Sequence, residues 1–193
     1  MKHMIKPALA LFAAAAVMTA LLGLVHALTL EPIENQLKRT RERIKQEILT
    51  GADVFEELVV EPSGSIVRVY EAFNGDGPVG YLLELSPAGY SGQIDLMVGL
   101  SSVDGTVAGM RVLKHSETPG LGALAVKESF YRQFDGRKLI PLRVVKGASG
   151  EDEIDAITGA TVTTQAIAGA VNEAVEWYGG YHPETRPNGG GRD

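Results

Sequence analysis

The chain is organised around one stretch near its C-terminal end, Thr158-Gly159-Ala160-Thr161-Val162-Thr163-Thr164. Directly after it, apolar residues recur at the spacing of one helical face, namely Ala166, Ile167, Ala170, Val171, Ala174 and Val175. Thr163 and Thr164 therefore fall at or near a helix N-terminus, where free N–H groups and the helix dipole favour an anion such as phosphate. The simpler interpretation is that these threonines only cap the helix. One hydroxyl suffices for a cap, however, and Thr164 stands where a capping box has Glu or Gln.

Upstream of this stretch, alternating apolar residues predict a sheet. Candidate strands cover 55–60, 66–73, 79–85, 94–100 and 107–113, and Asp104-Gly105 is a strong hairpin signal. Closely spaced strands with short turns favour an antiparallel meander. A helix is expected after Gly122, with Ala123, Val126, Phe130 and Phe134 on one face, and a further strand at 142–145. The predicted fold class is α+β, with a mainly antiparallel sheet and flanking helices.

A second polar segment, His115-Ser116-Glu117-Thr118-Pro119-Gly120-Leu121-Gly122, follows the predicted sheet. Pro119-Gly120 is typical of a turn, and Gly122 allows a close approach of the backbone. Its polar side chains supply donors and acceptors for a ligand. The alternative is a plain strand-to-helix loop in which Thr118 caps the helix. Because no nucleophile pattern accompanies His115, no catalytic residue is assigned.

The N-terminal region predicts a membrane anchor. Residues 7–30 are almost uncharged, and 24 residues of helix span about 36 Å, enough to cross a hydrocarbon core of about 30 Å. A secretory signal peptide with a cleavage site at Val25-His26-Ala27 is the alternative, although the apolar run is longer than usual for one. The basic residues on both sides leave the orientation open. A literal positive-inside count keeps the domain in the cytoplasm, but long translocated domains override that rule.

The predicted domain organisation has four parts. Residues 1–30 form a short tail and a transmembrane anchor, and 31–50 form a linker helix whose basic side chains contact either solvent or lipid phosphates. Residues 51–178 form the folded domain, and Gly179-Gly180 is expected to end its last helix. The Gly- and Pro-rich residues 179–193 are expected to be disordered.

Composition excludes several classes of function. The formal net charge is −6 and there is no long basic run, which argues against nucleic acid as a partner. There is no cysteine, which excludes disulfides, thiolate-bound zinc, iron–sulfur clusters and c-type haem attachment within this chain. Four scattered histidines argue against a metal site, so no metal ligand is predicted. An electron carrier in this chain would need an organic cofactor.

Thr158-Gly159-Ala160-Thr161-Val162-Thr163 resembles the [Ser/Thr]-Gly-Ala-[Ser/Thr]-x-Thr flavinylation motif of the FMN-binding domain family. The His115–Gly122 segment and the upstream Gly89-Tyr90-Ser91-Gly92 resemble two further segments of that family, in the same order. With the N-terminal span, the resemblance extends to the G subunits of Rnf (Rsx) ion-translocating electron transport complexes. The C subunits of sodium-pumping NADH:quinone reductases share the motifs but are usually longer.

The resemblance implies a covalent FMN, attached through its phosphate to Thr163 by a separate flavin transferase that uses FAD and magnesium. It implies an electron-carrying subunit of a ferredoxin/NAD-type complex in the cytoplasmic membrane. The domain would lie on the extracytoplasmic side, and the other subunits would be its partners. Thr158 and Thr161 would donate to phosphate oxygens beside Gly159 and Ala160. The segment with His115, Glu117, Thr118, Gly120 and Leu121 would complete the cofactor site, with Glu117, Thr118 and Leu121 lining the ring.

Two other functions stay open from the residues alone. One is a membrane-tethered sensory or binding domain that holds FMN, or another ligand, without a covalent bond. The other is an ectodomain that only scaffolds a membrane complex. A stand-alone hydrolase is disfavoured because the sequence shows no nucleophile–base arrangement.

Overall fold

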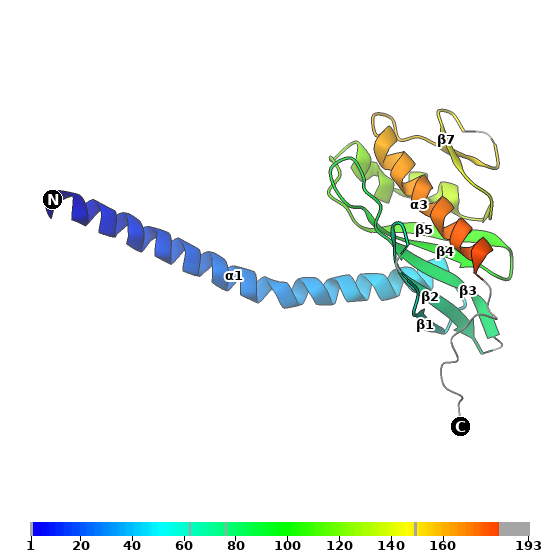
Figure 1. Ribbon diagram of the computed structural model, residues 1–193, viewed down its shortest axis with the longest axis horizontal. Coiled ribbons are helices and arrows are strands. Elements are labelled where there is room, and N and C mark those ends of the chain that lie inside the picture. The colour runs from blue at the N-terminus through cyan, green and yellow to red at the C-terminus, as the bar shows by residue number, and fades with distance from the viewer. Residues whose placement is uncertain (1, 62, 76, 149, 182–193) are drawn as a thin grey trace, which may run out of the picture. The chain divides into compact units, whose positions relative to one another are not determined.

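The computed structural model describes residues 2–61, 63–75, 77–148 and 150–181 (Figure 1). The chain divides into two units, Met1–Glu42 and Arg43–Asp193. Helix α1, Lys2–Ile48, begins in the first unit and ends in the second. Its segment Lys6–Thr29 has a mean hydropathy of 2.4, which is long and apolar enough for a membrane span. The predicted linker region therefore continues the same helix as the predicted anchor.

The second unit contains a six-stranded sheet in which neighbours in sequence are neighbours in space. Its strands are β1 Val54–Leu58, β2 Ile66–Asn74, β3 Gly77–Leu85, β4 Asp95–Ser101, β5 Thr106–Lys114 and β6 Arg137–Lys138. Every pair in this sheet is antiparallel. The predicted hairpin turn lies between β4 and β5, where Gly105 has a φ of 63°. The sequence prediction of an α+β fold with a mainly antiparallel sheet is confirmed.

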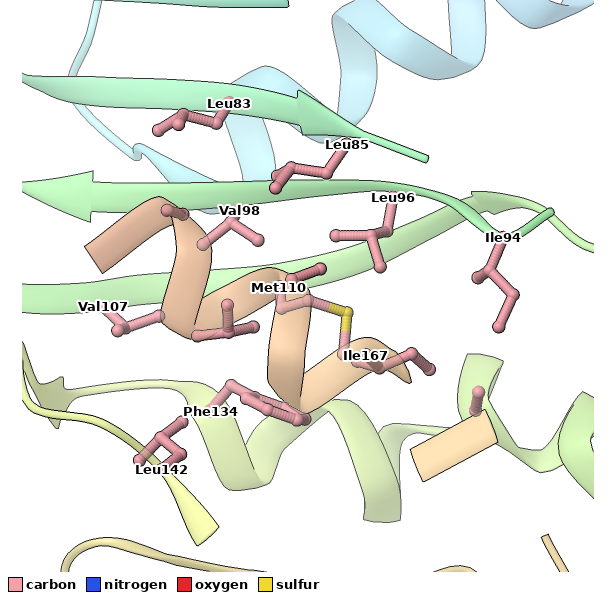
Figure 2. Packing of buried hydrophobic residues seen from close by; sticks show 14 of the residues in the cluster. Leu83, Leu85, Ile94, Leu96, Val98, Val107, Met110, Phe134, Leu142 and Ile167 are labelled. Atoms are coloured by element: carbon pink, nitrogen blue, oxygen red, sulfur yellow. The ribbon is translucent and has the colours of Figure 1, made fainter. Parts of the chain in front are cut away.

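The sheet buries side chains on both faces, because successive residues of a strand point to opposite sides. On one face, Leu83, Val98 and their neighbours pack against the C-terminal helix and the segment after β5 (Figure 2). On the other face, Leu82 and Met97 pack with Ile44 and Ile48 from the end of α1. The sheet is thus the middle layer of this unit, and its longer strands are apolar on both faces.

The segment after β5 differs from the single helix that the sequence predicts. It forms two 3₁₀ turns, η1 Gly122–Val126 and η2 Arg132–Phe134, on either side of the short helix α2 Glu128–Tyr131. Lys127 between η1 and α2 is extended, with φ −77° and ψ 142°. The extended residue and the tighter 3₁₀ winding change which side chains face the core. Ala125 is therefore buried, whereas Val126 is 43% exposed.

The chain then forms a small parallel pair, β7 Arg143–Val145 and β8 Glu153–Asp155, and ends in helix α3, Thr161–Gly180. Helix α3 lies over the sheet (Figure 1). The predicted apolar stripe is the face of α3 that packs on the sheet, with Ile167, Val171 and Ala174 buried. At its C-terminal end the Tyr181 ring lies 5.4 Å from the Tyr81 ring. The described part of the predicted tail thus contacts the core, and 182–193 lie outside the described residues.

Candidate functional site

The turn into α3 sets the geometry of the threonine stretch. The Ala160 N–H donates to the Ile157 carbonyl, and Gly159 adopts a φ of 78°, which favours glycine. The helix starts at Thr161 with Ala160 at the N-cap position, and no side chain of the described residues caps it there. Simple capping therefore does not account for the threonines. The N–H groups of the first helical turn precede the first intrahelical hydrogen bond and point toward the N-terminal end.

Thr163 and Thr164 are both buried, but their hydroxyls make hydrogen bonds to different parts of the chain. Thr164 Oγ1 donates to the Ala160 carbonyl at 3.0 Å and accepts the Ile157 N–H at 3.1 Å. Thr163 Oγ1 instead donates to Oε2 of Glu117 at 2.6 Å, joining residues that are 46 positions apart. Thr164 thus stabilises the turn, whereas Thr163 faces the polar segment that follows β5.

That polar segment is held in a tight turn. The carbonyl of Thr118 accepts hydrogen bonds from the N–H groups of Leu121 and Ala123, and Gly120 has a φ of 77°. The Glu117 N–H donates to Nδ1 of His115 at 3.2 Å. Thr118 does not cap η1, whose N-cap is Leu121 without a side-chain hydrogen bond. The turn places the Glu117 carboxylate toward α3.

Glu117 connects three segments of the chain. While Oε2 accepts from Thr163, Oε1 accepts the backbone N–H of Ser91 at 2.9 Å. The glycines around the carboxylate leave room for it: a Cβ on Gly89 would lie 2.6 Å from Oε1, and a Cβ on Gly122 would overlap Oε2. The threonine stretch, the His115–Gly122 segment and the Gly89–Gly92 loop therefore meet at one carboxylate.

The surroundings of the Glu117 carboxylate favour its ionised form. Burial by itself would raise its pKa. Hydrogen bonds from the Thr163 hydroxyl and from the backbone N–H groups of Ser91 and Tyr90 favour the charged form and outweigh burial. The nearby His115 also contributes, so the pKa of Glu117 lies below its usual value. The buried Glu117 carboxylate thus accepts a hydrogen bond from the Thr163 hydroxyl.

A cavity of about 400 Å³ opens beside this pair. Its lining combines polar groups, apolar side chains and two glycines, namely Tyr90, Glu117, Thr118, Leu121, Gly122, Gly159, Ala160, Thr161, Val162 and Thr163. Thr163 is only 1% exposed, whereas Tyr90 is 75% exposed. The cavity size is that of a small-molecule site, and it lies at the N-terminal end of α3, where an anion is stabilised.

Most of the residues predicted for the site line this cavity. Those that do are Gly159, Ala160, Thr161, Thr163, Glu117, Thr118 and Leu121. The other three predicted residues lie nearby but outside the lining, namely Thr158, His115 and Gly120. Thr158 lines a different hollow, together with Phe130 and Gln133. His115 contacts the backbone of Glu117, and Gly120 shapes the turn.

Three lining residues were not among those predicted: Tyr90, Gly122 and Val162. Tyr90 and Gly122 stand inside motifs that the sequence already singled out, so their positions carried a signal. Val162 lies between two motif threonines and is 49% exposed beside the cavity. Exposure of Tyr90, Leu121 and Val162 together gives the cavity an apolar rim.

Two family models match the sequence. One describes an FMN-binding domain and matches residues 89–176. The other describes the RnfG N-terminal region and matches residues 1–48. Together they cover the first helix and the part of the folded unit that contains the cavity.

Curated relatives match most of the chain. The G subunit of an ion-translocating oxidoreductase complex from Methanosarcina acetivorans is 35% identical over 170 residues, covering 83% of this chain and 89% of the relative. The G subunit of a Na⁺-translocating ferredoxin:NAD⁺ oxidoreductase complex from Acetobacterium woodii is 34% identical over 193 residues, covering 92% of each chain.

Solved structures with the same fold are C subunits of Na⁺-translocating NADH-quinone reductases. The one from Parabacteroides distasonis is 22% identical, with a TM-score of 0.57 over 77% of this chain and 94% of that chain. The NqrC structure from Shewanella oneidensis is 24% identical, with a TM-score of 0.50 over 56% of this chain and 54% of that chain. At these identities the likeness concerns the fold alone.

Proposed function

Because the chain belongs to the family of G subunits of ion-translocating oxidoreductase complexes, we propose that it is the FMN-carrying, electron-transferring subunit of such a complex. It acts as part of a redox enzyme complex with other subunits and not as a stand-alone catalyst. Its apolar N-terminal helix anchors it in the membrane. The domain lies on the extracytoplasmic side, where a flavin transferase acts on it.

The finer proposal is that FMN is bound covalently through its phosphate to Thr163. The observation that carries it is the different environment of the two adjacent threonines. Thr163 lines the cavity with its hydroxyl directed at Glu117, whereas Thr164 does not line the cavity and is held by the turn. Of these two hydroxyls, that of Thr163 is the one that a phosphate entering the cavity would reach.

The residues present fit an FMN group. The first-turn N–H groups of α3 and the Thr161 hydroxyl stand where the phosphate would lie, and the helix dipole favours its charge. Tyr90, Leu121 and Val162 offer an apolar rim to the ring, and glycines 122 and 159 also line the cavity. The bound FMN accepts and donates electrons, and the protein holds and orients it.

Intact mass is the experiment that tests the proposal. Full-length chain is coexpressed with a flavin transferase, and we expect its mass to rise by one FMN less one water, with the adduct on the peptide that contains Thr163. Thr163→Ala should abolish the adduct, Thr163→Ser should keep part of it because the hydroxyl remains, and Thr164→Ala should keep it. An adduct on Thr164 would contradict the assignment of the attachment residue.

The two alternatives give different results in the same experiment. Flavin that copurifies but is released on denaturation would indicate a domain that binds FMN without a covalent bond. Protein without flavin, despite a transferase that modifies a control substrate, would indicate a scaffold and overturn the proposal.

A further inference from the structure

We propose that Glu117 accepts the proton of the Thr163 hydroxyl when that hydroxyl is esterified, and then holds this proton beside the new phosphoester. This inference rests on the proposed function, because it concerns how Thr163 becomes the attachment residue. It makes Glu117 a residue of this chain that takes part in its own modification by the transferase.

The hydrogen bond between the two side chains is the first support. Thr163 Oγ1 lies 2.6 Å from Oε2 of Glu117, a distance typical of a hydroxyl that donates to an ionised carboxylate. A threonine hydroxyl is a weak nucleophile unless an adjacent base takes its proton. A group that accepts this proton must lie within hydrogen-bond reach of it, and Glu117 does so before any ligand is bound.

The burial of the pair is the second support. Thr163 is 1% exposed and Glu117 is 6% exposed, so bulk water has little access to the proton that must leave. The other carboxylate oxygen is fixed by the Ser91 N–H at 2.9 Å. That bond orients the carboxylate and leaves Oε2 directed at Thr163. The geometry thus provides one positioned acceptor for one proton.

The reaction balances without an oxidant or reductant. The co-reactant is a flavin dinucleotide, which the transferase supplies. A bond forms between Thr163 Oγ1 and the phosphorus on the FMN side. The pyrophosphate P–O bond breaks, and its electron pair leaves with AMP. The proton moves from Thr163 Oγ1 to Oε2 of Glu117.

The same carboxyl is suited to keep the proton afterwards. Esterification removes the Thr163 donor and places a phosphate anion next to Glu117, and both changes favour the neutral carboxylic acid. The protonated carboxyl would then donate a hydrogen bond to a phosphate oxygen. The hydrogen bond between these two positions is thus preserved with its direction reversed.

The chain contains a matched control for this role. Glu173 also accepts hydrogen bonds from a backbone N–H and a hydroxyl, those of Ser65, at 2.8 and 2.6 Å. No predicted attachment residue is part of that pair, and Glu173 does not line the cavity. Glu117→Gln and Glu173→Gln therefore make the same chemical change at carboxylates that accept the same two kinds of hydrogen bond, although Glu173 is only half-buried. Only Glu117→Gln removes the proposed proton acceptor.

The test measures the rate of modification. Unmodified full-length chain in detergent is mixed with purified transferase, FAD and magnesium, and intact mass is followed with time. We expect Glu117→Gln to slow FMN attachment about 100-fold, in the range of a lost general base, and Glu173→Gln to leave the rate within about twofold of the parent. Equal rates for Glu117→Gln and the parent would overturn the inference, whereas a parent that takes no FMN would overturn the proposed function instead.

The pH dependence separates proton transfer from a structural role. The rate of FMN attachment to Glu117→Gln, divided by the rate for Glu173→Gln, should increase with pH, because hydroxide replaces the missing proton acceptor. Dividing by the rate of the control removes the pH dependence of the transferase. The titratable side chains beside Glu117 are His115, which contacts its backbone, and Tyr90, which lines the same cavity. A constant ratio would show that Glu117 only shapes the site.

A second measurement uses only the parent protein, so it does not depend on whether a Glu117 variant folds. Carbon-13 NMR of glutamate side-chain carboxyls is recorded on unmodified and modified parent protein across an acidic pH series. One carboxyl is expected to titrate at higher pH after modification, and the other carboxyls are expected to keep their pKa values. A set of titrations that is unchanged, or moved to lower pH, would overturn the proposed transfer to Glu117.

Discussion

Gly122 lies directly against Thr163: a Cβ atom added to Gly122 would stand 2.7 Å from Thr163 Oγ1 and would overlap Oε2 of Glu117. The missing side chain at position 122 is therefore what allows these two side chains to meet. In the sequence Gly122 looks like part of a turn motif, but in the structure its lack of a side chain leaves room for the hydrogen bond between Thr163 and Glu117.

Gly122→Ala is expected to slow FMN attachment at least about tenfold, because the methyl group must displace either Thr163 or Glu117 from their hydrogen bond. Intact mass with time gives the rate. Gly169→Ala is the control: its Cβ meets no atom of the described residues within 4 Å, and Gly169 does not line the cavity. Similar rates for the two variants would show that the clearance at 122 does not matter.

The stability of the unmodified domain at acid pH should depend on Glu117. Its pKa is lower in the folded than in the unfolded chain, so the unfolded state binds more protons. The free energy of unfolding therefore contains a contribution that is present above the unfolded pKa and is lost as pH falls through the folded pKa. Urea titrations between about pH 6 and pH 3 should show a flatter acid limb for Glu117→Gln than for the parent. Parallel limbs would contradict the ionised, hydrogen-bonded state of this carboxylate.

The bond between Glu173 and Ser65 is expected to stabilise the domain. The carboxylate joins α3 to the turn before β2 through two hydrogen bonds, from the Ser65 N–H and Oγ. Glu173→Ala should lower the free energy of unfolding by about 1–3 kcal/mol, since it leaves both donors without this acceptor. Ser65→Ala removes only one of the two bonds and should cost about 1 kcal/mol. Equal stabilities of both variants and the parent in urea titrations would refute this role.

Gly169→Ala is expected to stabilise the domain. Gly169 lies exposed within α3, and a Cβ there meets no atom of the described residues within 4 Å. Alanine in a helix interior is favoured over glycine by about 0.8–1 kcal/mol, so the thermal midpoint should rise. Gly80→Ala provides the contrast, because its Cβ would collide with the backbone carbonyl of Leu100 on β4 and should destabilise the sheet. A lower midpoint for Gly169→Ala would mean that the helix is strained at that position.

The strands were predictable because alternation is a local property. Leu82 and Leu83 point to opposite faces as their positions require, and Asp104-Gly105 forms the expected turn. The prediction of a single helix after Gly122 was wrong, because the spacing of apolar residues does not reveal where a helix is interrupted. The extended Lys127 interrupts the winding, so Ala125 takes the buried place that was assigned to its neighbour Val126.

The site was predictable in its parts and not in their assembly. Glu117 and Thr163 each stood in a recognisable motif, but their hydrogen bond exists only once β5 and α3 are packed. Thr158 illustrates the opposite case. It begins the motif, yet the positive φ of Gly159 turns the chain between it and the cavity, so it faces another hollow. Local sequence does not specify such a change of direction.

The 46-residue separation of Glu117 and Thr163 also bears on when the proposed cofactor attachment can take place. An unfolded chain contains every residue of the motif but lacks the carboxylate beside the hydroxyl. If Glu117 takes the proton, cofactor attachment requires a folded domain, so misfolded chains do not acquire the flavin. Only chains that have reached their tertiary structure would then bring the proposed flavin into the assembly of the complex.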